Sequence, residues 1–148
     1  MKIRIKRISD PACGEITLPR YMTPGAAGMD IFAANREPMT LRPMERALVP
    51  TGFAVELPEG FEAQIRPRSG LAIKQGVTML NTPGTIDPDY RGEVKIIVVN
   101  LGSEPVTIAC GDRIAQMIIG RFTRIEWEET DDLSATRRDA GGFGHMGQ

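Results

Sequence analysis

Short apolar stretches separated by glycine and proline are the feature that most restricts how this chain can fold. The 148 residues include 16 glycines and 11 prolines, and the sequence shows no sustained helical period. Phe61, Ala63 and Ile65, for example, alternate with polar residues, as in a strand with one buried face. Many short strands of this kind predict an all-β fold of the sandwich or jelly-roll type.

Strands are expected to cover most of the chain, with one short helix. The expected strands are residues 3–8, 28–33, 40–49, 52–57, 61–67, 85–86, 94–99, 106–109, 115–119 and 122–127, and the helix is expected at 70–75. A chain of this length buries roughly 70% of the surface that its unfolded form exposes, which is enough for a core. Without an internal repeat or a linker, residues 1–136 are predicted to form one domain.

The last twelve residues, RRDAGGFGHMGQ, differ in composition from the rest of the chain. Residues 137–148 carry several glycines and one aromatic side chain, Phe143, so they are expected to form a flexible arm when free. One interpretation is a frayed end. The other is a lid that closes over a nucleotide, because arginine pairs with phosphate and phenylalanine stacks on a flat ring.

The net charge and the cysteines restrict the classes of function. A net charge of −1 provides no basic field, so neither nucleic acid nor a membrane is expected as a partner. The sequence has no apolar stretch of membrane-spanning length and no signal-peptide pattern at its start. Cys13 and Cys110 lie far apart without a metal-binding spacing. A disulfide stays open, but two free thiols in a reducing cytoplasm are the simpler expectation.

A polar and aromatic cluster lies in the segment NTPGTIDPDYRGEVK, residues 81–95. Two carboxylates, Asp87 and Asp89, are followed by Tyr90 and Arg91, between stretches that are expected to be strands. Such a cluster is either a solvent-exposed turn, in which Asp, Pro and Gly are common, or part of a functional site.

Two further segments have residues suited to binding phosphate. Arg68, Ser69 and Gly70 follow an expected strand where a short helix could begin, although a serine there is often only a helix cap. Near the expected strand 115–119, Asp112 and Arg113 could pair across the turn. Gln116, inside this apolar strand, would then need a polar partner if it points inward. Asp30, at the start of another strand, adds one acid.

Five segments resemble, in order and approximate spacing, the five motifs of the trimeric deoxyuridine triphosphatase (dUTPase) family. They are AAGMDIFA at 26–33, PRSGLA at 67–72, NTPGTIDPDYRGEVKI at 81–96, GDRIAQMII at 111–119 and RDAGGFG at 138–144. The resemblance implies a distorted jelly-roll (β-clip-like) domain that assembles as a homotrimer with active sites between subunits. It also implies the Mg²⁺-assisted hydrolysis of dUTP to dUMP and pyrophosphate.

The same resemblance implies how the catalytic and phosphate-binding roles are divided. Asp87 would act as the general base that activates the water attacking the α-phosphorus. The turn at residues 68–70 matches the family's phosphate-binding turn, and Gln116 matches a phosphate contact. Mg²⁺ prefers phosphate oxygens and water, so the triphosphate and waters would hold it without direct protein ligands. Asp30 would contact the metal at most through a water.

Selection of the base and the sugar is implied for the hairpin. Asn81 matches the asparagine that contacts uracil, since an amide offers both a donor and an acceptor. Backbone groups around Thr85, Ile86 and Lys95 would complete the recognition of uracil. Tyr90 matches the ring that packs under deoxyribose, which leaves no place for a ribonucleotide's 2′-hydroxyl.

The fifth motif would act from the arm, in a neighbouring subunit's site. Arg138 would meet the γ-phosphate, and Phe143 would cover the uracil. His145, the single histidine, stands where the family usually has a small hydroxyl residue. It is either a solvated residue of the arm or a group that makes closure of the arm pH-dependent.

Three other functions compete with dUTP hydrolysis. A deaminase of dCTP shares this fold, but it would need a glutamate at the base, and the Asp-Pro-Asp-Tyr-Arg-Gly sequence favours release of pyrophosphate. A non-catalytic trimer could bind dUTP and signal through its arm. A plain structural β domain would leave the clustered polar motifs without a purpose.

Overall fold

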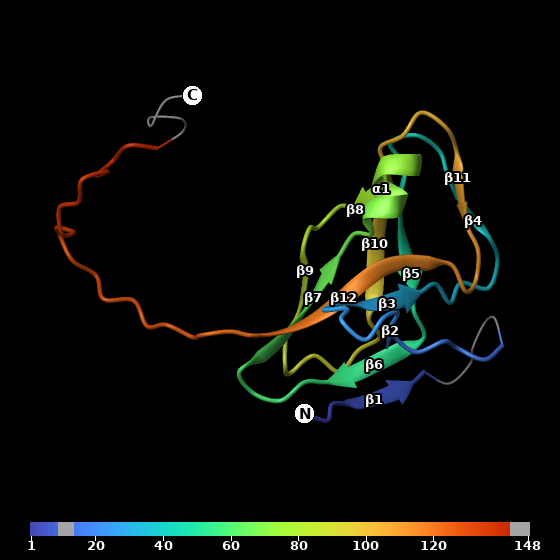
Figure 1. Cartoon of the computed structure of the whole chain (residues 1–148), viewed down its shortest axis with the longest axis horizontal. Coiled ribbons are helices and arrows are strands. Elements are labelled where there is room, and N and C mark those ends of the chain that lie inside the picture. The colour runs from blue at the N-terminus through green and yellow to red at the C-terminus, as the bar shows by residue number, and fades with distance from the viewer. Residues whose placement is uncertain (9–13, 143–148) are drawn as a thin grey trace.

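The computed structural model of the chain describes residues 1–8 and 14–142. Within them lie one helix and a series of short strands joined by turns (Figure 1). The elements are β1 (Arg4–Arg7), β2 (Arg20–Tyr21), β3 (Met29–Phe32), β4 (Met39–Leu41), β5 (Arg46–Pro50), β6 (Phe53–Glu56), β7 (Phe61–Arg66), α1 (Ser69–Gln75), β8 (Val77–Met79), β9 (Gly84–Ile86), β10 (Lys95–Asn100), β11 (Val106–Ile108) and β12 (Arg113–Arg121). The predicted all-β class is confirmed.

Four small antiparallel sheets make up the domain. The largest has the order β2-β3-β12-β7-β9, and a second has the order β5-β10-β8. Two pairs, β1-β6 and β11-β4, complete the set. In Figure 1 the long strand β12 crosses in front of β5 and β10, so that the two larger sheets face one another across the core.

The core forms between these sheets from side chains of alternating strand positions. Ile31, Met117 and Ala63 come from the five-stranded sheet, and Val49 and Ile96 come from the β5-β10-β8 sheet. The alternation predicted for β7 is confirmed, since its apolar positions turn inward and its polar positions face outward. This leaves the outer face of the five-stranded sheet to polar side chains, and part of the candidate site lies on that face.

Two of the predicted strands are wrong. The stretch 40–49 is divided into β4 and β5 by a turn in which Met44 has a φ of 68°. The strand predicted at 122–127 is absent, because β12 ends at Arg121 and residues 122–142 run away from the sheets as one extended segment (Figure 1). Trp127, which is 92% exposed, has the alternating pattern of a strand, but no strand lies beside it in the described part of the chain. The predicted division of the chain after residue 136 stays a prediction.

The expectation of two free thiols is also wrong. Cys110 is disulfide-bonded, while Cys13 lies outside the described residues. Separation along the sequence says little about separation in the fold: Gly111 N, in the turn that holds Cys110, donates a hydrogen bond to Ala33 O, in the residue that follows β3. In the part of the chain that the structure describes, we find no helix long and apolar enough to cross a membrane.

Candidate active site

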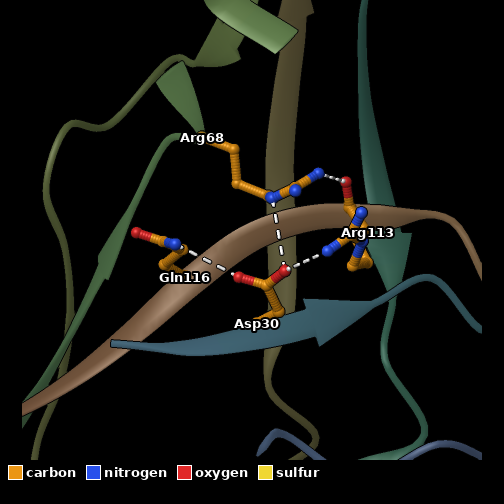
Figure 2. A network of polar contacts seen from close by, with 4 residues as sticks. All are labelled: Asp30, Arg68, Arg113 and Gln116. Carbon is orange, nitrogen blue, oxygen red and sulfur yellow. Dashed lines mark hydrogen bonds and ion pairs between the residues drawn. The ribbon is translucent and has the colours of Figure 1, made fainter. Parts of the chain in front are cut away.

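A buried carboxylate, that of Asp30 on β3, is the centre of the densest polar network in the five-stranded sheet (Figure 2). Its Oδ2 lies 3.2 Å from Arg113 Nη1 and 3.5 Å from Arg68 Nε. Its Oδ1 accepts a hydrogen bond of 3.1 Å from Gln116 Nε2. Arg68 Nη1 also donates to the backbone carbonyl of Arg113, at 2.9 Å. We call these four residues the Asp30 cluster.

A β-bulge explains how two residues of β12 that lie three positions apart reach the same carboxylate. The pairing of β12 with β3 is regular at Gln116 and Ala115, but Arg113 lies opposite Phe32, which leaves Ile114 as an extra residue. Both Ile114 and Ala115 are buried in the core. In regular alternation Arg113 would turn toward the core, whereas the bulge turns it to the side on which Gln116 lies.

Gln116 faces away from the core, so the condition under which a polar partner was predicted for it is not met, although it does bind Asp30. The pairing considered for Arg113 is wrong. Asp112 does not pair with Arg113, because its Oδ2 accepts a hydrogen bond of 2.7 Å from Ala109 N, within the turn. Arg113 instead pairs with Asp30, and sequence reasoning gave it no place in the site. Two consecutive apolar residues between polar ones, as in Arg-Ile-Ala-Gln, are the signal that would have suggested the bulge.

The helix predicted after Arg68 is confirmed as α1. Arg68 is the N-cap residue and makes no side-chain cap hydrogen bond, so Ser69 is the first helical residue and does not cap the helix. Ser69 and Gly70 are exposed at this first turn, directly after Arg68, whose guanidinium belongs to the Asp30 cluster. The turn thus offers a hydroxyl and backbone N–H groups next to a held cation.

The hairpin residues Asn81, Thr85 and Ile86 lie at the edge of the same sheet. The edge strand β9 pairs with β7 through Gly84 opposite Ile65. A Cβ on Gly84 would lie 3.2 Å from Asn81 Nδ2, so the glycine leaves room for the amide. Asn81 and Thr85 are exposed and Ile86 is half-buried, so the structure places all three at an accessible edge of the sheet.

Tyr90 is held in place by the backbone of its own turn. Its phenol donates a hydrogen bond of 3.0 Å to the carbonyl of Glu93, while the ring stays 45% exposed. The side chain of Glu93 lies 3.5 Å from Lys95 Nζ and accepts a hydrogen bond of 2.9 Å from Gly52 N. The exposed ring of Tyr90 therefore has a fixed orientation, as a surface for packing requires.

Asp87 lies apart from the Asp30 cluster. It is exposed and lines a hollow of about 820 Å³ that contains no residue of that cluster. The hollow is lined by Leu57, Glu59, Gly60, Asp87, Pro88, Asp89, Arg91, Phe122 and Arg124. By register, Asp87 lies two strands from β12 and four positions beyond Gln116. The backbones of Asp87 and Gln116 are thus roughly 16 Å apart, at about 3.3 Å per residue and 4.8 Å between strands.

The arm does not bring Arg138 to the Asp30 cluster or to the hollow that Asp87 lines. Arg138 Nε donates to the carbonyl of Gly141 at 2.7 Å, within a turn of the extended segment that leaves the domain (Figure 1). In this turn Asp139 has a φ of 43°, a conformation that favours glycine. Phe143 and His145 lie outside the described residues.

Comparison with known proteins identifies the family of the chain. A family model described as dUTPase matches residues 14–147. A deoxyuridine 5′-triphosphate nucleotidohydrolase of Thermoanaerobacter sp. is 57% identical over 145 residues, which cover 98% of this chain and 97% of the relative. An enzyme of the same name from Rickettsia felis is 57% identical over 131 residues, covering 88% of each chain.

Among solved structures, a dUTPase of Staphylococcus bacteriophage 80alpha with dUpNHpp is similar in fold. Its TM-score is 0.87 at 26% sequence identity, and the match covers 99% of both chains. The predicted jelly-roll class is confirmed by this likeness. The family model and the two relatives together show that the chain belongs to the dUTPase family.

Proposed function

We propose that this protein hydrolyses dUTP to dUMP and pyrophosphate, by attack of water at the α-phosphorus. The reaction removes dUTP from the nucleotide pool and supplies dUMP for thymidylate synthesis. The observation that carries the proposal is the Asp30 cluster, in which one buried carboxylate holds Arg68 and Gln116, the two side chains that match phosphate contacts in the family's motifs. The expected cytoplasmic location stays a prediction.

The Asp30 cluster and the first turn of α1 bind the triphosphate in this proposal. Gln116 donates one amide hydrogen to Asp30 Oδ1, which fixes the amide so that its second hydrogen can meet a phosphate oxygen. Arg68 adds charge-assisted hydrogen bonds, and Ser69 and Gly70 add a hydroxyl and backbone N–H groups. Donors that are already ordered stabilise the negative charge that develops on the leaving pyrophosphate.

The described residues suit a Mg²⁺ ion that is held by the substrate. Among residues 1–8 and 14–142, no group of three or more His, Cys, Asp or Glu side chains could hold a metal. The Asp30 carboxylate is occupied by three donors of the chain, so it is available to a metal only through water. When bound to the triphosphate, Mg²⁺ would polarise phosphoryl oxygens and neutralise charge on the leaving group.

Asp87 is the proposed general base, and its position supports active sites between subunits. A base must lie within hydrogen-bond reach of the water that it activates. In one chain, the backbones of Asp87 and Gln116 are roughly 16 Å apart. Strand side chains stand nearly perpendicular to the sheet, so the side chains of Asp87 and Gln116 do not shorten this separation by much. A homotrimer in which one copy supplies Asp87 and its neighbour supplies the Asp30 cluster removes the difficulty.

The hairpin that carries Asp87 also selects the substrate. The exposed amide of Asn81 would bind uracil together with backbone groups at Thr85, Ile86 and Lys95, and the fixed ring of Tyr90 would pack under deoxyribose. The arm would then close over the bound nucleotide. Arg138 would approach the γ-phosphate, and Phe143 would cover the base.

A substrate panel tests this proposal. The protein is incubated with Mg²⁺ and with dUTP, dCTP, dTTP or UTP in parallel, and pyrophosphate and ammonia are both measured. Pyrophosphate from dUTP, with little from the other three nucleotides, is the expected result. Ammonia from dCTP would favour a deaminase of the same fold, and tight binding of dUTP without turnover would favour a signalling module.

A further inference from the structure

We propose that Arg113 is a positioning residue that keeps Arg68 available to the triphosphate. The side chain of Arg113 pairs with Asp30 at 3.2 Å, and its backbone carbonyl accepts a hydrogen bond of 2.9 Å from Arg68 Nη1. Figure 2 shows both contacts, which come from opposite ends of the same residue. The inference rests on the proposed role of Arg68 as a phosphate ligand, and it adds a residue to which the sequence motifs gave no role.

The first argument is the charge on the buried carboxylate. The side chain of Asp30 is 3% exposed, so its negative charge needs partners inside the protein. Arg113 lies closer to Asp30 Oδ2 than Arg68 does, at 3.2 Å against 3.5 Å. One carboxylate and two guanidinium groups leave a net positive charge. Without Arg113 the sum is zero, and Arg68 becomes the only counter-ion of Asp30.

This difference matters because the proposed ligand is a polyanion. A guanidinium that neutralises a buried carboxylate has less charge to offer a phosphate, and the carboxylate itself repels the ligand. Arg113 takes up the charge of Asp30, so that the charge of Arg68 remains for the triphosphate. Arg113 is 44% exposed against 22% for Arg68, so it pairs with Asp30 from the wetter side.

The second argument is geometric. Arg68 uses Nε for Asp30 and Nη1 for the carbonyl of Arg113, which fixes the plane of its guanidinium. Its Nη2 has no hydrogen-bond partner in the described part of the chain, so this nitrogen remains for a ligand. The bulge at Ile114 places the side chain of Arg113 beside Asp30 and its carbonyl beside Arg68.

Substitution of Arg113 tests the proposal, with Arg46 as a matched control. Arg46 is an exposed arginine of β5, outside the site. Arg113→Gln is expected to raise the KM for dUTP about tenfold, the size of one lost charged interaction, with a much smaller change in kcat. Arg46→Gln should change neither constant. Arg113→Lys keeps the charge and should raise KM less than Arg113→Gln; an equal rise would contradict the argument from charge.

A compensating substitution separates positioning from direct contact with phosphate. Asp30→Asn combined with Arg113→Gln restores the net charge of the cluster and still offers Gln116 an oxygen acceptor. We expect the KM of this double variant for dUTP to return most of the way to the wild-type value. The Kd for dUpNHpp, measured by calorimetry, should rank the wild type and the variants in the same order as KM. Because the double variant has no buried carboxylate at position 30, it remains informative even if Arg113→Gln alone does not fold.

Two further results would overturn the inference. One is a KM for Arg113→Gln equal to that of the wild type. The other is a double variant as weak as Arg113→Gln, which would mean that Arg113 itself binds phosphate. Failure of the proposed function looks different, since the wild-type protein would then release no pyrophosphate from dUTP.

Discussion

The phenol oxygen of Tyr90 occupies space that a side chain on residue 92 would need. A Cβ built on Gly92 would lie 2.4 Å from Tyr90 Oη and 2.6 Å from the ring carbon that carries it. The ring is rigid and its hydroxyl is bound to the Glu93 carbonyl, so it cannot yield without leaving that position. Gly92 therefore sets the orientation of the ring that is proposed to pack under the sugar.

Gly92→Ala is expected to reduce the preference for dUTP over UTP. The added methyl group displaces the Tyr90 ring from its hydrogen bond, and the displaced ring no longer excludes a 2′-hydroxyl. We expect the ratio of kcat/KM for dUTP to that for UTP to fall by about tenfold, the size of one lost interaction. Gly25→Ala is the control, since its Cβ would meet nothing within 4 Å. An unchanged ratio would mean that the orientation of Tyr90 does not determine the selection of deoxyribose over ribose.

Asp87→Asn is expected to lower kcat by on the order of 10² or more, while dUTP still binds, because only the general base is lost. Steady-state kinetics and calorimetry with dUpNHpp measure the two effects separately. Asp89→Asn is the matched control, since Asp89 is an exposed carboxylate in the same turn and lines the same hollow. Equal losses in the two variants would show that the charge of the hollow matters and that Asp87 has no special role.

Two inactive variants should restore activity when they form a mixed trimer. Asp87→Asn lacks the base and Arg68→Gln lacks a phosphate ligand, so each homotrimer is expected to be nearly inactive. If a site takes Asp87 from one subunit and Arg68 from its neighbour, random assortment leaves about a quarter of the sites intact. Equal amounts of the two variants are mixed, unfolded and refolded together, and then assayed for release of pyrophosphate from dUTP. No recovery beyond that of the separately refolded proteins would place both residues in one subunit.

Gly76→Ala should destabilise the fold more than Gly60→Ala. Both glycines have a positive φ, which is 67° for Gly76 and 76° for Gly60, so either substitution costs about 1 kcal/mol of backbone strain. A Cβ on Gly76, at the C-cap of α1, would also lie 2.4 Å from Gly102 N, whereas one on Gly60 meets nothing within 4 Å. We expect Gly76→Ala to lower the free energy of unfolding by about 3 kcal/mol, measured by urea denaturation at the same protein concentration as the wild type. Equal losses for the two variants would contradict the packing at this helix end.

Local patterns in the sequence were enough to predict the strand class and several details of the site. The alternation in β7 places Ala63 and Ile65 in the core, and the helix expected at 70–75 is found as α1. Such features depend on residues that are close together along the chain, so they can be read from one sequence.

Features that depend on pairing between distant segments could not be predicted. The side to which Arg113 turns is set by a bulge against β3, and a shift of one residue in register would reverse it. The alternating pattern around Trp127 has no strand to pair with among residues 1–8 and 14–142, and sequence alone could not show this. The separation of Asp87 from the Asp30 cluster likewise follows from the order of the strands in the sheet.

Hydrolysis in ¹⁸O-labelled water is the most direct test of the proposed reaction. The protein is given dUTP and Mg²⁺ in labelled water, and both products are examined by mass spectrometry after a single turnover. Attack of water at the α-phosphorus predicts one ¹⁸O in the phosphate of dUMP and none in pyrophosphate. Label in pyrophosphate, or no release of dUMP, would contradict the account.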